Sequence, residues 1–93
     1  MDTALSPQEI HETEHLIEAE LPPGASFHAL RTRKAGARRF IEFHLLVPGE
    51  TSVSESHVLC DRIEEALTGQ LAKASVTIHV EPQEAHAPHG LPP

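Results

Sequence analysis

The segment that most limits the fold is residues 39–47, which alternates like a β-strand but carries bulky apolar groups on both faces. One face holds Ile41, Phe43, Leu45 and Val47, and the other holds Phe40, Glu42, His44 and Leu46. A strand that is apolar on both faces is usually covered on both sides. We therefore expect residues 39–47 to form a central strand, or a strand with one face covered by a partner.

Helix signals stand on both sides of this segment. Ser6-Pro7-Gln8-Glu9 and Ser52-Val53-Ser54-Glu55 both match the capping box. They predict helices over residues 7–20 and 53–68, the second of them ended by Gly69. Alternating apolar residues predict two further strands, over residues 27–33 and 74–81, with a turn at residues 35–37.

The resulting order αββαβ predicts an α+β domain. A strand, a helix and a strand in succession favour a right-handed parallel crossover, which gives a three-stranded mixed sheet with both helices on one face, close to half of a ferredoxin-like sandwich. The other sheet face, with Phe40 and Leu46, is left open, and an open face on so small a domain predicts a homodimer. We expect one domain over residues 1–82 and a disordered tail over residues 83–93, which is rich in Pro and His.

The net charge of the chain limits the classes of partner that it is expected to bind. A net charge of −7 disfavours nucleic acid and anionic lipid and favours cations. Five of the seven basic residues lie in one stretch, which we interpret as a solvated hairpin end, with a surface for an acidic partner as the alternative: Arg31, Arg33, Lys34, Arg38 and Arg39. The single cysteine rules out an intrachain disulfide, and no signal peptide or membrane-length apolar run is visible. We expect a soluble, cytoplasmic protein.

Imidazole and carboxylate groups lie where this topology can gather them. Alternation places His79 and Glu81 on one face of the last strand, about 7 Å apart at their α-carbons. A three-residue turn would place His28 opposite His44 on the same face, whereas a two-residue turn would place them on opposite faces. We favour the three-residue turn, centred on Gly36.

His57, near the start of the second helix, needs the fold or a second subunit to reach the other histidines. Nitrogen and oxygen ligands together suit a borderline cation such as zinc. The candidate metal ligands are thus His28, His44, His57, His79 and Glu81. The alternative is that they are ordinary surface histidines.

Three other motifs carry less weight. His11-Glu12-Thr13-Glu14-His15 is a literal H-E-x-x-H, but we reject a zinc peptidase because the helix is short and 93 residues leave no room for a substrate cleft. A weak metal site at this histidine pair is an alternative to a solvated acidic face. We interpret His86 and His89 as part of the disordered tail, with a loose metal-binding pair as the alternative. We interpret Cys60 as a small buried hydrophobic residue. No nucleophile stands beside a base and no Gly-rich phosphate loop is present, so we do not expect an enzyme.

Five blocks of sequence carry a family resemblance. They are residues 28–33 (HALRTR), Ala35-Gly36, residues 39–45 (RFIEFHL), Ser56-His57 and residues 76–82 (VTIHVEP). In this order they resemble the cytoplasmic C-terminal domain of cation diffusion facilitators, dimeric exporters of zinc and other divalent metals. The resemblance covers residues from about 7 to 82.

The resemblance implies a metallochaperone-like αββαβ fold and a V-shaped homodimer, in which bound zinc changes the opening of the dimer and so regulates a transmembrane domain. The ligand positions of the family map to His28, His44, His57 and His79. The carboxylate that follows them is often Asp in the family and is Glu81 here.

The chain begins at Met1, directly before the first helix, so the resemblance implies a standalone form of the regulatory domain, or an excised one. We expect a zinc-preferring homodimer that buffers, delivers or senses metal, with an affinity that falls below about pH 6 because imidazole must be neutral to bind. The alternative is an interaction module that binds a transporter or another partner through the open sheet face and the basic hairpin, with metal incidental.

Overall fold

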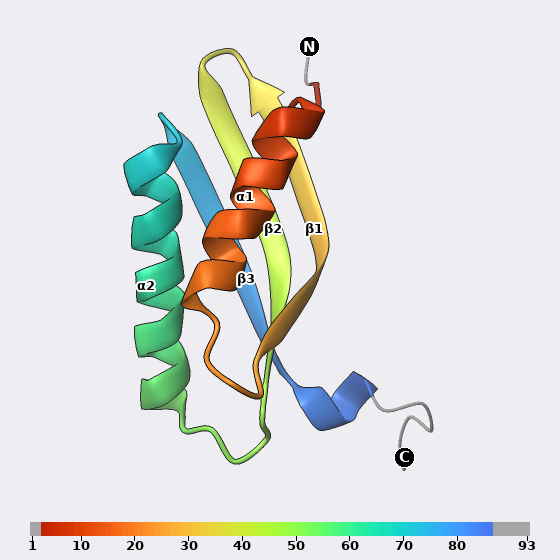
Figure 1. The fold of residues 1–93 in the computed structure, drawn as a ribbon, viewed down its shortest axis with the longest axis vertical. Coiled ribbons are helices and arrows are strands. Elements are labelled where there is room, and N and C mark those ends of the chain that lie inside the picture. The colour runs from red at the N-terminus through yellow and green to blue at the C-terminus, as the bar shows by residue number, and fades with distance from the viewer. Residues whose placement is uncertain (1–2, 87–93) are drawn as a thin grey trace.

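A computed structural model describes residues 3–86 of the chain. Its elements are α1 (Pro7–Glu20), β1 (Ser26–Ala35), β2 (Arg38–Val47), α2 (Val53–Gln70), β3 (Ala74–Pro82) and the short 3₁₀ helix η1 (Gln83–His86). The strand order is β1-β2-β3, with β1 antiparallel and β3 parallel to β2. The predicted α+β fold, with β2 at the centre of a three-stranded mixed sheet and both helices on one face, is confirmed (Figure 1). None of the helices in the described part of the chain is long and apolar enough to cross a membrane.

Both helices begin at the predicted capping boxes. The Ser6 hydroxyl accepts a hydrogen bond from the Glu9 N–H at 3.1 Å, and the Glu9 carboxylate accepts one from the Ser6 N–H at 3.0 Å. Ser52 and Glu55 repeat this exchange at 3.0 and 2.9 Å. Each pair satisfies two N–H groups that the first helical turn leaves without a partner.

The predicted end of the second helix at Gly69 is wrong. α2 continues through Gly69 to Gln70, and the N–H of Leu71 donates to the carbonyl of Leu67 at 2.8 Å. Both leucines are buried in the core, with 0% and 3% of their surface exposed for Leu67 and Leu71. The last turn of α2 is therefore held by apolar burial, which outweighs the weak helix propensity of a single glycine.

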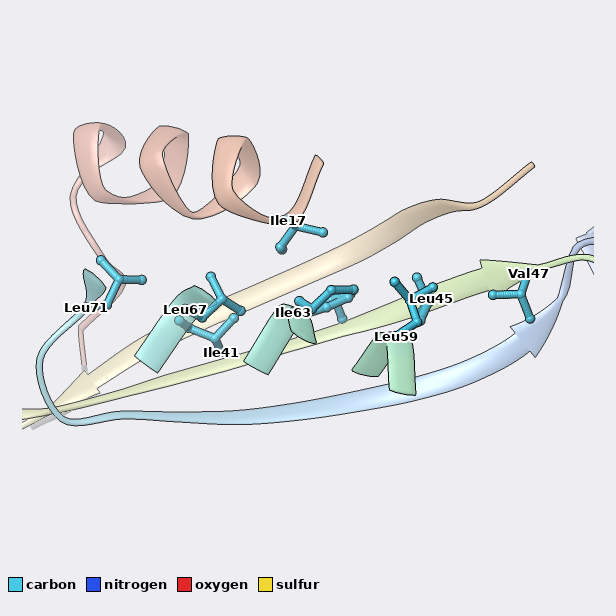
Figure 2. Close-up of a cluster of buried hydrophobic side chains, with 9 residues drawn as sticks. Ile17, Ile41, Leu45, Val47, Leu59, Ile63, Leu67 and Leu71 are labelled. Carbon is cyan, nitrogen blue, oxygen red and sulfur yellow. The ribbon is translucent and has the colours of Figure 1, made fainter. Parts of the chain in front are cut away.

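The core lies between the sheet and the two helices. Figure 2 shows the buried side chains of β2 facing those of α1 and α2. The helical contribution comes from Ile17 on α1 and from a stripe of three residues on α2: Leu59, Ile63 and Leu67. Burial of each such side chain contributes about 1.5–3 kcal/mol. Cys60, which we expected to be buried, is only half-buried, and it packs against this core as a small hydrophobic residue.

Glu9 joins the start of α1 to the β1–β2 hairpin. Its carboxylate lies 3.0 Å from the Lys34 ammonium and 3.0 Å from the Arg39 guanidinium. The hydrogen bond from the Ser6 backbone, then that from Lys34 and that from Arg39, lowers the pKa of Glu9 to about 2. Two cations of the basic hairpin are therefore used within the fold.

The β1–β2 hairpin differs from the prediction in its turn. Ala35 pairs with Arg38, so the turn holds two residues rather than three, and Gly36 takes a φ of 61° that suits glycine. The register then shifts between His28 and Arg31, where β1 carries one extra residue. This β-bulge includes Ala29, whose φ of 57° is in the left-handed region. The bulge restores the pairing of His28 with His44 that the two-residue turn alone would have lost.

The first four residues of the predicted disordered tail form η1. The side-chain amide of Gln83 donates to the carbonyl of Gly24 at 2.9 Å, and the Glu84 carboxylate accepts from the N–H of Gly49 at 3.3 Å. These contacts explain why the chain keeps a regular conformation past Pro82. Residues 87–93 lie outside the described residues. They hold His89 and the rest of the predicted tail.

Candidate metal centre

Three imidazoles form a row across the open face of the sheet. His28 pairs with His44 across β1 and β2, and His44 pairs with His79 across β2 and β3. Neighbouring strands lie about 4.8 Å apart, and the ring centroids of the two pairs are 5.2 and 5.1 Å apart. Each strand therefore supplies one imidazole at the same height of the sheet.

Glu81 brings a carboxylate to two of these rings. It follows His79 by two residues on β3 and so shares its face, as the alternation predicts. One carboxylate oxygen lies 2.8 Å from Nδ1 of His44, and the other lies 3.9 Å from Nε2 of His28. The carboxylate thus faces both imidazoles at once.

His79 has a different carboxylate neighbour, which the sequence analysis did not single out. Its Nε2 lies 3.0 Å from an oxygen of Glu42 on β2. Alternation already places Glu42 on the face of His44, but its contact with His79 depends on the parallel register, in which Glu42 pairs with Thr77. Two carboxylates therefore face three imidazoles, a charge balance that favours a cation.

The distances among three of these residues suit a metal ion. The ligand atoms of His28, His44 and Glu81 all lie within 4.8 Å of one another. In a tetrahedral zinc site with bonds of about 2.0 Å, neighbouring ligand atoms are about 3.3 Å apart. The side chains are 41%, 34% and 29% exposed, so small side-chain rotations are enough to close this difference. Among the described residues, no other group of three such side chains converges in this way.

His57 is not brought to this group within one chain. Its side chain is 74% exposed on α2, where it lies 3.4 Å from the Asp61 carboxylate one turn away. Ser56, the residue before it, lines a shallow hollow together with Val80 and Glu81. The first turns of α2 therefore lie near the edge of the sheet that carries Glu81, while the imidazole of His57 points to solvent. Its role as a ligand stays a prediction that needs a second chain or a change of conformation.

Sequence comparison identifies the family. The family described as the cytoplasmic domain of cation efflux proteins matches residues 5–83. The chain belongs to this family. The resemblance to cation diffusion facilitators is thereby confirmed, and the family is one of transporter domains rather than of enzymes.

Individual relatives agree with this assignment. The chain is 39% identical over 84 residues to the uncharacterized transporter sll1263 of Synechocystis, covering 90% of this chain and 27% of that protein. It is 36% identical to the cation-efflux pump FieF of Pectobacterium atrosepticum, covering 91% and 28% of the two chains. The chain therefore spans about a quarter of the length of these relatives. Among solved structures, the Zn form of CzrB is 43% identical with a TM-score of 0.80, covering 89% of this chain and 94% of that one.

Proposed function

We propose that this chain is a zinc-preferring, homodimeric metal-binding domain without catalytic activity, which acts as the metal-responsive part of a cation efflux system. The observation that carries the proposal is the Glu81 carboxylate facing the imidazoles of His28 and His44. His79, next in the row of imidazoles, is positioned to complete the ligand set. His57 of a second chain is a further ligand under the same proposal.

The preference for zinc follows from the ligand types. Imidazole nitrogens with one carboxylate oxygen suit Zn²⁺, whereas Mg²⁺ and Ca²⁺ prefer oxygen ligands alone. Glu42 beside His79 is placed to orient that ring, as carboxylates commonly do for histidine ligands. The similarity to the Zn form of CzrB supports the same preference.

The homodimer follows from the uncovered face of the sheet. Both helices lie on the opposite face (Figure 1), so the imidazole row, with Phe40 beyond it, faces away from the core. A second copy that covers this face would bury the site and could add ligands to it. Zinc binding and dimer formation are then linked, and each strengthens the other.

The similarity to cation-efflux pumps supports a role for this binding in metal export. Because the chain spans only about a quarter of them, its part in a full-length pump is to report bound metal to a transporter domain. As a separate protein, the same domain would buffer, deliver or sense the metal. Both roles depend on reversible binding at the imidazole row.

Zinc titration of metal-free protein by calorimetry tests the proposal. We expect micromolar or tighter binding, weakened by about 10- to 100-fold in Glu81→Gln and at least as much in His44→Ala. Glu65→Gln is the matched control because Glu65 is an exposed carboxylate on α2, away from the site. Sedimentation measured with and without zinc shows whether the chain is a monomer or a dimer. Binding no tighter than millimolar, or equal loss in Glu65→Gln, would refute the metal site.

One observation supports the rival function of an interaction module. At the hairpin end of the open face, the Arg33 guanidinium lies 3.9 Å above the Phe40 ring, and both line a hollow with Arg31, Ser75 and Thr77. Glu42 also lines this hollow, so two arginines and one carboxylate leave it with a net positive charge that suits an acidic partner. The double variant His79→Ala/Glu81→Gln separates the functions, because partner binding would survive in a module that does not depend on metal.

A further inference from the structure

The outward face of α1 carries a second set of side chains of the types that can bind metal ions. α1 packs on the sheet through Thr13 and Ile17, which are fully buried. On its other side, Gln8, His11, Glu12 and His15 line one shallow hollow together with Leu16. Positions i, i+3, i+4 and i+7 share a helix face, so these four polar side chains form one continuous stripe.

From this stripe we infer that α1 holds a second divalent transition-metal site, separate from the imidazole row of the sheet. The ligands are the imidazoles of His11 and His15, with water completing the coordination. Residues four apart on a helix have β-carbons about 5–6 Å apart, a spacing at which two imidazoles can turn toward one ion. The rigid helix fixes this spacing, because His11 and His15 are both in its regular part.

The two imidazoles are available for a ligand. Both residues are exposed. Within residues 3–86, neither the His11 nor the His15 imidazole takes part in a hydrogen bond or an ion pair, in contrast to that of His57, which lies against Asp61. A metal ion at the pair therefore displaces no internal contact of the fold.

The metal class follows from the ligand number. Two imidazoles on an exposed surface bind more weakly than a site with ligands from three strands, so this site fills after the sheet site. For nitrogen ligands without geometric constraint, affinity follows the Irving–Williams order, with Cu²⁺ ahead of Ni²⁺ and Zn²⁺. We expect Cu²⁺ to bind this site most tightly.

The two sites can be told apart by their position. α1 lies on the helix side of the sheet (Figure 1), whereas the imidazole row lies on the open side. A paramagnetic ion at one site therefore broadens the amide signals of a different set of residues from an ion at the other. Titration of ¹⁵N-labelled full-length protein with Cu²⁺, followed by NMR, resolves them.

The matched control keeps composition and charge and changes only the spacing. Gln8→His combined with His11→Gln leaves histidines at positions 8 and 15, seven residues and about 10.5 Å apart along the helix axis. One ion cannot then contact both rings. We expect this variant to weaken Cu²⁺ binding at α1 by about a hundredfold, since the second ligand no longer binds as part of the same molecule. The double variant His11→Ala/His15→Ala should abolish it.

In the wild-type protein, we expect Cu²⁺ to broaden the amides of residues 8–15 in addition to those around the sheet site. Broadening confined to the sheet or to other regions would overturn the inference. Equal broadening at α1 in the spacing variant would also overturn it, because binding would then need no histidine pair. Neither result bears on the zinc site of the sheet, which the Glu81 and His44 variants test separately.

Discussion

The bulge at Ala29 decides on which face of the sheet His28 lies. The two-residue turn pairs Arg31 with Glu42. Continued without interruption, that register would set Ala29 opposite His44 and His28 opposite Leu45, whose side chain is buried toward the helices. The extra residue in β1 keeps His28 opposite His44, but its backbone conformation costs free energy. An L-residue in the left-handed region, as Ala29 is at φ 57°, loses about 1–2 kcal/mol.

Ala29→Gly should therefore stabilise the protein. Glycine removes that cost but loses about 0.5–1 kcal/mol through its greater freedom in the unfolded chain, so the net gain is about 0–1.5 kcal/mol. In a domain of this size, 1 kcal/mol shifts Tm by about 4–8 °C. Ala29→Val should have the opposite sign, because a β-branched side chain fits this conformation worse than alanine does. Urea unfolding at pH 7 measures both.

Deletion of Ala29 tests the role of the bulge in the site. Without the extra residue, a regular ladder pairs Leu30 with Phe43 and His28 with His44, so His28 stays on the open face. We expect the deletion protein to bind zinc as the wild type does, whereas His28→Ala weakens binding. A folded deletion protein that binds as poorly as His28→Ala would refute this register argument, and so would an Ala29→Gly protein less stable than wild type.

Three further substitutions follow from contacts in the fold. Because the pKa of Glu9 lies at about 2 in the folded state, below the value of 4.5 for the unfolded chain, its stabilisation is complete above about pH 4.5 and is lost as the pH falls toward 2. Glu9→Gln should lower the free energy of unfolding at pH 7 and flatten its pH dependence in that window, as measured by urea unfolding at several pH values. Ser52→Ala removes the cap of α2 and should cost about 1 kcal/mol in the same assay. Ile63→Ala, at a fully buried position, should cost about 2–5 kcal/mol in chemical denaturation. An unchanged unfolding midpoint in any of the three would contradict the contact assigned to it.

The fold could be predicted because its signals are local. The capping boxes at Ser6 and Ser52 involve residues three apart, and the two faces of β2 follow from its alternation alone. The end of α2 could not be predicted in this way, since Gly69 is a stop signal by propensity. Burial of Leu71 against other elements overrides that signal, and such contacts are not visible in a local window.

The candidate site likewise has parts that local sequence signals predict and parts that depend on the folded sheet. Alternation alone predicts that His44 lies on one face of β2 and that His79 and Glu81 share one face of β3. The parallel register of β2 and β3 brings these faces together. The predicted face of His28 is correct, but the predicted reason is wrong. The bulge, and not a three-residue turn, places His28 opposite His44. Alanine has no preference for a left-handed conformation, so nothing at position 29 signals the bulge. The contact of Glu42 with His79 likewise depends on a register that only the folded sheet defines.

The origin of the ligands bears on what a bound ion does to the domain. The candidate ligands His28, His44 and Glu81 come from β1, β2 and β3, so an ion held by all three would tie both edge strands to the centre. The core lies on the other face of the same strands and supplies none of these three side chains. Under the proposed function, we therefore expect metal binding to add its free energy to the stability of the sheet without rearranging the packing beneath it. A change on binding is then expected in the open face and in whatever covers it, which is the surface through which a second copy would respond to metal.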